Sequence, residues 1–162
     1  MHQTPEGQAP GDGANISEFS SGPLQPVVAG LALSGADEPA GYLFLVSRSG
    51  RVKRITLNDL VGVRGNEAVV MGIEAKDALL AAFITPGQSE VMLVSAKGQA
   101  IRFPEEEVRP MGLPAAGVWG MKLAKGDELV GAGLIKPRGD VVMITQKGLG
   151  KRTGLSQFPK QG

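Results

Sequence analysis

From residue 26 onward, the apolar residues of the chain occur in short blocks separated by Gly, Pro, Asp or Ser. Examples are "YLFLV" at 42–46, "VMLVS" at 91–95 and "VVMIT" at 141–145. Short blocks bounded by turn residues are typical of strands, and no stretch of about 11 residues carries the apolar period of a helix. The pattern therefore predicts an all-β fold of many short antiparallel strands.

The blocks repeat along the chain. When "LFLVSRSGRVKRI" (43–55) is placed above "VMLVSAKGQAIRF" (91–103) and "VVMITQKGLGKRT" (141–153), glycines align at 50, 98 and 148 and arginines align at 54, 102 and 152. "DALLAAFI" likewise matches "DELVGAGL" farther along. A period of about 50 residues indicates a solenoid, a propeller or an array. The repeats start near residues 42, 90 and 140.

Each repeat has four apolar segments, which predicts a blade of four antiparallel strands. The first segment is continuously apolar and should be buried on both faces. A hairpin follows, with the aligned glycine at the position that needs positive φ. In the second repeat, "GVWGM" (117–121) is the expected third strand and "ELVGAGLI" (128–135) the fourth. Residues 26–33, "PVVAGLAL", are the expected fourth strand of a preceding blade. The prediction is an incomplete ring with two full blades and parts of two others.

The charge is distributed unevenly between a tail and the repeats. Residues 1–25 are rich in Gly, Pro, Ser and acids, which predicts a disordered tail or linker ahead of a folded part at 26–162. Residues 1–41 contain five acidic and no basic residues, whereas residues 42–162 hold all 17 basic residues and 11 acids. A basic folded part is compatible with a polyanion partner, although an ordinary solvated surface gives the same balance.

Several function classes are disfavoured by what the sequence contains. It has no cysteine and one histidine, His2, in the expected tail, which argues against a metal site, a cofactor site or a histidine-based catalytic site. "KGLGKRTG" (147–154) has one residue between its first two glycines, too short a loop to wrap a nucleotide phosphate. No apolar run of about 18 residues predicts a membrane span. The adjacent acids Asp127 and Glu128 fit a turn better than acid/base chemistry.

Four motifs follow one another within the repeat frame: "RPMG" (109–112), "GVWGMKL" (117–123), "GDEL" (126–129) and "GLGKRT" (148–153). Together they make residues 26–162 resemble the C-terminal domain of the bacterial DNA gyrase A subunit, and that of its topoisomerase IV counterpart. The resemblance implies a β-pinwheel, a propeller-like ring of about six blades whose basic perimeter wraps double-stranded DNA. Trp119 stands where the family's third-strand motif has arginine.

The resemblance also implies partners. The chain would be a non-catalytic piece of an ATP-dependent type IIA DNA topoisomerase, working with the ATPase B subunit, and with the catalytic part of the A subunit. A cytoplasmic, nucleoid-associated location follows, with gyrase and topoisomerase IV parentage both open. Open blade edges would also permit self-association.

Basic residues in and beside the hairpins are the candidate DNA contacts. The recurring arginines have two readings, either phosphate contact or a planar fork that binds carbonyls or a carboxylate between blades. The predicted DNA-binding residues are Arg51, Lys53, Arg54, Lys97, Arg102, Arg109, Lys122, Lys147, Lys151 and Arg152. The few aromatic residues and the lack of a long helix favour sequence-independent contact with bent duplex. The alternative is a propeller-type protein interaction module with no DNA role.

Overall fold

The computed structural model describes residues 26–33, 40–61, 63 and 68–161. Its elements in chain order are β1 (Tyr42–Ser47), β2 (Arg51–Thr56), α1 (Leu57–Val61), β3 (Leu79–Thr85), β4 (Glu90–Ser95), β5 (Ala100–Pro104), η2 (Glu105–Glu107), β6 (Val118–Trp119), β7 (Leu129–Ile135), β8 (Asp140–Ile144), β9 (Gly150–Gly154) and η3 (Leu155–Gln157). The strands form antiparallel sheets with the orders β3-β1-β2-β6, β5-β4-β7 and β8-β9. The all-β prediction is confirmed.

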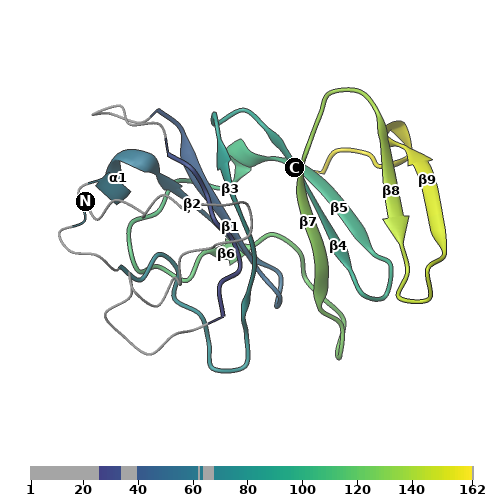
Figure 1. Ribbon diagram of the computed structural model, residues 1–162, viewed down its shortest axis with the longest axis horizontal. Coiled ribbons are helices and arrows are strands. Elements are labelled where there is room, and N and C mark those ends of the chain that lie inside the picture. The colour runs from purple at the N-terminus through teal and green to yellow at the C-terminus, as the bar shows by residue number, and fades with distance from the viewer. Residues whose placement is uncertain (1–25, 34–39, 62, 64–67, 162) are drawn as a thin grey trace, which may run out of the picture.

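The three sheets stand next to one another as successive blades, called blades 1, 2 and 3 here (Figure 1). β1, β4 and β8 begin at residues 42, 90 and 140. Blades 1 and 2 have the same register: Val46 pairs with Ala81 of β3, and Val94 pairs with Gly131 of β7. Each of these pairings has a register shift at the next residue, so the sequence repeat is also a structural one.

The third strand lies in a different blade from the one predicted. β6, from the second repeat, pairs with β2 of blade 1 through Arg51↔Trp119 and Val52↔Val118. The chain here passes between two blades, and glycine is needed for the close approach: a Cβ on Gly120 would lie 2.6 Å from a methyl group of Val52. The second repeat therefore donates a short strand to the blade before it, and the prediction of a blade built from one repeat is wrong.

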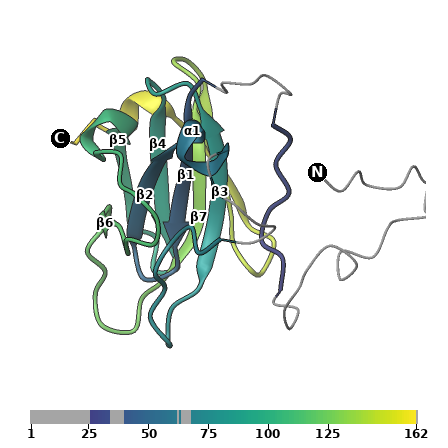
Figure 2. The same ribbon diagram turned by 90° about the vertical axis from the view of Figure 1, so that its left-hand side faces the viewer.

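Residues 26–33 also differ from the prediction. They are described but form no strand, and all eight are exposed. Figure 2 shows them as a separate extended segment beyond β3. A strand needs a neighbour to satisfy its backbone groups, and no described strand lies hydrogen-bonded beside this segment. The predicted tail at 1–25 lies outside the described residues.

The core lies on both faces of β1, as predicted, whereas in β4 only the face with Val91 and Leu93 belongs to a core cluster. On one face, Phe44 and Val46 of β1 are fully buried with Val91 and Leu93 of β4, which joins the two blades. Full burial of one such side chain contributes roughly 1.5–3 kcal/mol. The other face of β1 packs in a second cluster around Leu57 of α1 and Met71. β8 departs from this pattern because no described blade covers its outer face.

No helix within the described ranges has the length and apolar character needed to cross a membrane. α1 has five residues, and the two 3-10 helices among the described residues have three each. The helical segments therefore serve as turns between strands.

Candidate nucleic-acid interface

The three hairpins place their turns along one edge of the molecule, at the bottom of Figure 1. Each turn closes with a glycine at positive φ, 98° at Gly50, 84° at Gly98 and 79° at Gly148. In blade 2, the Gly98 N–H donates to the carbonyl of Ser95 at 3.0 Å, and the other two turns have the same bond. The residue before the glycine thereby occupies the tip, and in blades 2 and 3 this residue is a lysine.

Two of the turns are held by an aspartate that lies two residues before the fourth strand. Asp77 Oδ1 accepts from the Ser49 N–H at 2.8 Å and its Oδ2 from the Ser49 hydroxyl at 2.6 Å. Asp127 repeats this contact with the Lys97 N–H at 3.1 Å. Desolvation raises the pKa of both carboxyl groups, but the hydrogen bonds outweigh it and leave each pKa below 3.8. Asp127 therefore stabilises a turn, as the sequence indicated.

The lysines near the hairpins are exposed. Lys97 donates from Nζ to the carbonyl of Lys125 at 2.9 Å, which holds its ammonium group at the surface. Lys147 and Lys151 are exposed on blade 3, and Lys122 is exposed after β6. Across the described part of the chain, these four lysines form no ion pair within 4.0 Å. Their charges are available to an external anion.

Two further predicted residues are exposed or partly exposed. Arg109 lies on the surface after η2. Arg51 is half-buried: its guanidinium lies 4.4 Å from the ring centroid of Trp119, donates to the Gly117 carbonyl at 3.4 Å and approaches Glu74 at 3.6 Å. Trp119 is itself 51% exposed. Arg51 thus supports an exposed aromatic side chain and keeps part of its own charge at the surface.

Lys53 lies in the interior rather than at the surface. Its side chain is fully buried, and Nζ donates to the carbonyl of Val70 at 2.9 Å. Burial lowers the pKa of this ammonium group because the charged form loses water. The prediction that Lys53 contacts DNA is therefore wrong: the segment around Val70 covers it.

The recurring arginine is structural in blades 1 and 2. Arg54 is 7% exposed, donates to the Gly87 carbonyl at 3.4 Å and lies 4.4 Å over the ring of Tyr42. Its burial removes it from the set of accessible phosphate contacts, which corrects the prediction for this residue. The reading as a planar fork between segments is the one that its contacts support.

Arg102 has the same role with a different partner. Its Nε donates to Glu90 Oε2 at 2.6 Å, and Nη1 donates to the carbonyls of Leu155 and Phe158 at 3.3 Å each. These contacts join blade 2 to the segment after β9, so phosphate binding by Arg102 is not supported. Arg152 pairs with Asp140 but keeps a side chain that is 76% exposed.

The partners of the three arginines occupy the same position in each repeat. Tyr42, Glu90 and Asp140 each precede their arginine by 12 residues and start the first strand of a blade. An aromatic face or a carboxylate at this position binds a guanidinium. This pairing was not predicted from the sequence, although it is visible in the alignment of the repeats.

Other exposed basic residues were also missed. Arg48 lies in the first hairpin turn and forms an exposed pair with Glu128 at 3.5 Å. Lys125 lies beside Lys97. Neither stands in an aligned basic column, so the repeat did not select them. Within the described residues, no group of three or more His, Cys, Asp or Glu could hold a metal ion.

Known proteins show a consistent similarity. The family "DNA gyrase C-terminal domain, beta-propeller" matches residues 41–86, 89–136 and 139–162. The chain is 40% identical to the DNA gyrase A subunit of Pseudomonas aeruginosa over 126 residues, which are 77% of this chain and 14% of the relative. The DNA gyrase A subunit of Escherichia coli K12 is 39% identical over 72% of this chain and 13% of the relative. The chain thus spans only a small part of these relatives.

Solved structures agree with the sequence comparison. The DNA gyrase A C-terminal domain superposes with a TM-score of 0.77 at 28% identity, over 93% of this chain and 50% of that one. The C-terminal domain of DNA topoisomerase IV superposes with a TM-score of 0.74 at 33% identity, over 79% of this chain and 40% of that one. From its repeats, its blades and these similarities, the chain belongs to the DNA gyrase C-terminal domain family.

Proposed function

We propose that this chain binds the backbone of double-stranded DNA without sequence preference and bends it, as part of the A subunit of a bacterial type IIA topoisomerase. The observation that carries the proposal is the row of hairpin turns along one edge, with Lys97 and Lys147 at two successive tips (Figure 1). Lys151 and Lys122 extend the basic surface on neighbouring segments.

The chemistry of this edge suits phosphate rather than bases. Exposed lysines without acidic partners release counterions from DNA when they contact phosphate, and this release drives binding. The described helices are too short to enter a major groove, and Trp119 is the one exposed large aromatic residue in the described ranges. Bending a duplex of 20–30 bp costs roughly 1–6 kcal/mol, which contacts on successive blades would offset.

The remaining members of the proposed contact set are Arg51, Arg109 and Arg152, whose guanidinium groups are partly or fully accessible. The proposed partners are DNA, the ATPase B subunit, and the catalytic part of the A subunit, since the relatives are gyrase A subunits of which this chain covers a small part. A cytoplasmic, nucleoid-associated location belongs to the same proposal.

A salt titration tests DNA binding. If about four of the seven proposed residues contact phosphate at the same time, the slope of log affinity against log salt concentration should be near −3.6, and each lost contact should reduce its magnitude by about 0.9. Lys97→Ala, Lys147→Ala and Lys151→Ala should each lower the slope. Lys136→Ala is the matched control, because this exposed lysine follows β7 at the opposite end of the strands. Binding without salt dependence would refute the proposal.

One observation favours the alternative of a protein interaction module. Trp119 is half exposed and is held by Arg51, and tryptophan and arginine are common anchors of protein interfaces. Trp119 is also the single tryptophan of the chain, so its fluorescence reports on this site alone. Under the alternative, DNA causes no emission change and no gel retardation at low salt, while Trp119→Ala abolishes binding of an identified protein partner.

A further inference from the structure

Trp119 lies beside the hairpin turn of blade 1, whose four strands are all described. β6 pairs with β2 through Arg51↔Trp119. The next two N–H groups of the chain, those of Gly120 and Met121, donate to the carbonyl of Gly50 at 2.9 and 3.1 Å. β6 and β3 are the two edge strands of this blade, on opposite sides of it (Figure 2). The tryptophan is therefore held at an edge of blade 1, at the same end of the strands as the hairpin turns.

The turn of blade 1 lacks the lysine that the other two turns have. The residue before the turn glycine is Lys97 in blade 2 and Lys147 in blade 3, but Ser49 in blade 1. Ser49 instead borders a hollow of about 360 Å³, together with Trp119 and Lys122. A duplex that follows the turns of blades 3 and 2 would next reach an aromatic ring at blade 1.

The ring of Trp119 is fixed by contacts within the protein. The guanidinium of Arg51 lies 4.4 Å from the ring centroid, and the same group donates to the carbonyl of Gly117 at 3.4 Å and lies 3.6 Å from the carboxylate of Glu74. Trp119 nevertheless remains 51% exposed. A side chain that is already restricted loses little conformational entropy when it binds, so this exposed ring is prepared for a contact.

A single exposed ring suits a bent duplex better than a single strand. Single-strand sites stack successive bases on several aromatic side chains. Within the described ranges, no large aromatic side chain other than Trp119 is exposed. Proteins that bend duplex DNA often insert one apolar side chain between two base pairs from the minor groove, which unstacks that step and bends the helix. The ammonium group of Lys122, beside the ring, suits the phosphates that flank such a step.

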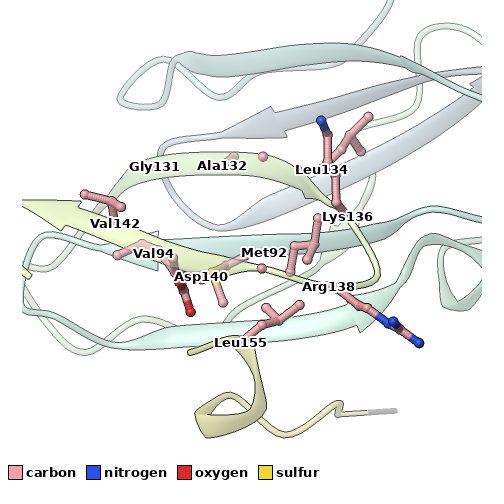
Figure 3. A pocket seen from close by; sticks show the side chains of 14 residues that line it. Met92, Val94, Gly131, Ala132, Leu134, Lys136, Arg138, Asp140, Val142 and Leu155 are labelled. Atoms are coloured by element: carbon pink, nitrogen blue, oxygen red, sulfur yellow. The ribbon is translucent and has the colours of Figure 1, made fainter. Parts of the chain in front are cut away.

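The larger groove along β7 and β8 offers no such ring. It measures about 580 Å³ and is lined mainly by aliphatic and small residues, among them Met92, Leu134 and Val142 (Figure 3). None of the described residues that line it is aromatic. In the part of the chain that the structure describes, a stacking contact is therefore confined to the edge of blade 1.

We propose that Trp119 inserts between two base pairs of the bound duplex and thereby fixes the position of the bend. The inference rests on the DNA binding proposed above and adds one contact to it: the basic residues hold the backbone, and the indole opens one base step. The insertion reads no base edge. It favours steps that unstack easily, such as TA and CA/TG.

Tryptophan emission tests the contact, because Trp119 is the single tryptophan of the chain. The 162-residue chain is titrated with a dye-labelled duplex of about 30 bp, and the anisotropy of the dye reports binding. We expect quenching of the emission and protection from acrylamide along the same binding curve, since stacked bases quench and cover the indole.

The outcomes of this titration separate the two proposals. Binding with unchanged emission would overturn the insertion and leave the proposed function in place, and Trp119 would then be free to anchor a protein partner. An absence of DNA binding at low salt would refute the proposed function itself, and the insertion with it.

Energy transfer between dyes at the two ends of the duplex tests the bend. Trp119→Ala should lower the transfer in the bound state and leave the salt slope unchanged, because no phosphate contact is lost. Trp119→Phe keeps an aromatic ring beside Arg51 and should retain the bend, which separates loss of the inserted ring from loss of folding. Lys122→Ala is the matched control: it should keep the bend and reduce the magnitude of the salt slope by about 0.9. Equal transfer for Trp119→Ala and the unchanged chain would overturn the proposal.

A duplex with one mismatched base pair at its centre tests insertion between the bases. The mismatch lowers the cost of unstacking, so the affinity of the unchanged chain should rise by about tenfold. Trp119→Ala should gain nothing, because it inserts no side chain. An equal gain for both chains would show that the mismatch acts through DNA flexibility alone, and would overturn the insertion.

Discussion

Replacement of Arg102 by alanine separates a structural arginine from a DNA contact. Arg102 has a side chain that is 11% exposed and pairs with Glu90. It also donates to the carbonyls of Leu155 and Phe158 at 3.3 Å each, beyond the last strand. All of these bonds link parts of the protein to one another. We therefore expect Arg102→Ala to reduce stability and to leave the salt dependence of DNA binding unchanged.

The expected loss of stability depends on which groups Arg102→Ala leaves without a hydrogen-bond partner. Hydrogen bonds to charged groups contribute roughly 1.5–3 kcal/mol each in favourable cases. Glu90 keeps Lys160 as a partner, and the carbonyls lie near the surface, where water replaces part of the loss. A net loss of about 2 kcal/mol is expected, and at about 4 °C per kcal/mol the melting temperature should fall by about 8 °C.

The assay combines thermal unfolding with a salt titration of DNA affinity. Lys97→Ala is the comparison variant, because its exposed ammonium group should change the salt slope by about 0.9 and the melting temperature little. The reasoning would be refuted if Arg102→Ala kept its melting temperature and lost about one unit of salt slope.

Three further predictions concern the folded state. Glu105→Leu should cost about 2–3 kcal/mol in urea unfolding, because the buried carboxylate accepts two backbone N–H groups and a hydroxyl that leucine cannot satisfy; an unchanged midpoint would contradict this. Gly50→Ala should prevent stable folding, since its Cβ would lie 2.3 Å from the carbonyl oxygen of Met121. Gly148→Ala has open space around it and should cost only about 1–2 kcal/mol for its positive φ. Equal losses of stability in thermal melts of the two variants would argue against the close contact at Gly50. Asp77 and Asp127 have lowered pKa values in the folded state, so their contribution to stability is present above about pH 4 and is lost as the pH falls below it. In Asp77→Asn, the urea midpoint should therefore fall less between pH 7 and pH 3 than it does in the unchanged chain. If both midpoints fell by the same amount, Asp77 would have no such role.

The repeat made most of the fold predictable. Alternation of short apolar blocks with turn residues locates the first, second and fourth strands, because backbone pairing and burial impose the same pattern on each blade. The glycines of the hairpins were identified from their place in the repeat, and their positive φ angles follow from turn geometry.

The candidate site was predicted only in part, for a physical reason. Lys97 and Lys147 precede a turn glycine and must lie at a tip, so local sequence determines their exposure. Lys53 lies in a strand whose cover comes from a segment around Val70, and no local pattern records that contact. A charged residue in the sequence indicates a surface position only where no distant segment of the chain packs over it.

The sequence by itself determined the all-β class, the repeat, the turn positions and the family resemblance, since each depends on residues close together in the chain. The tertiary structure alone decided that β6 belongs to the neighbouring blade and that Arg54 and Arg102 bind the protein. Both outcomes depend on how two blades approach each other. The close approach of Gly120 to the Val52 side chain and the burial of a guanidinium become favourable only after the blades have packed.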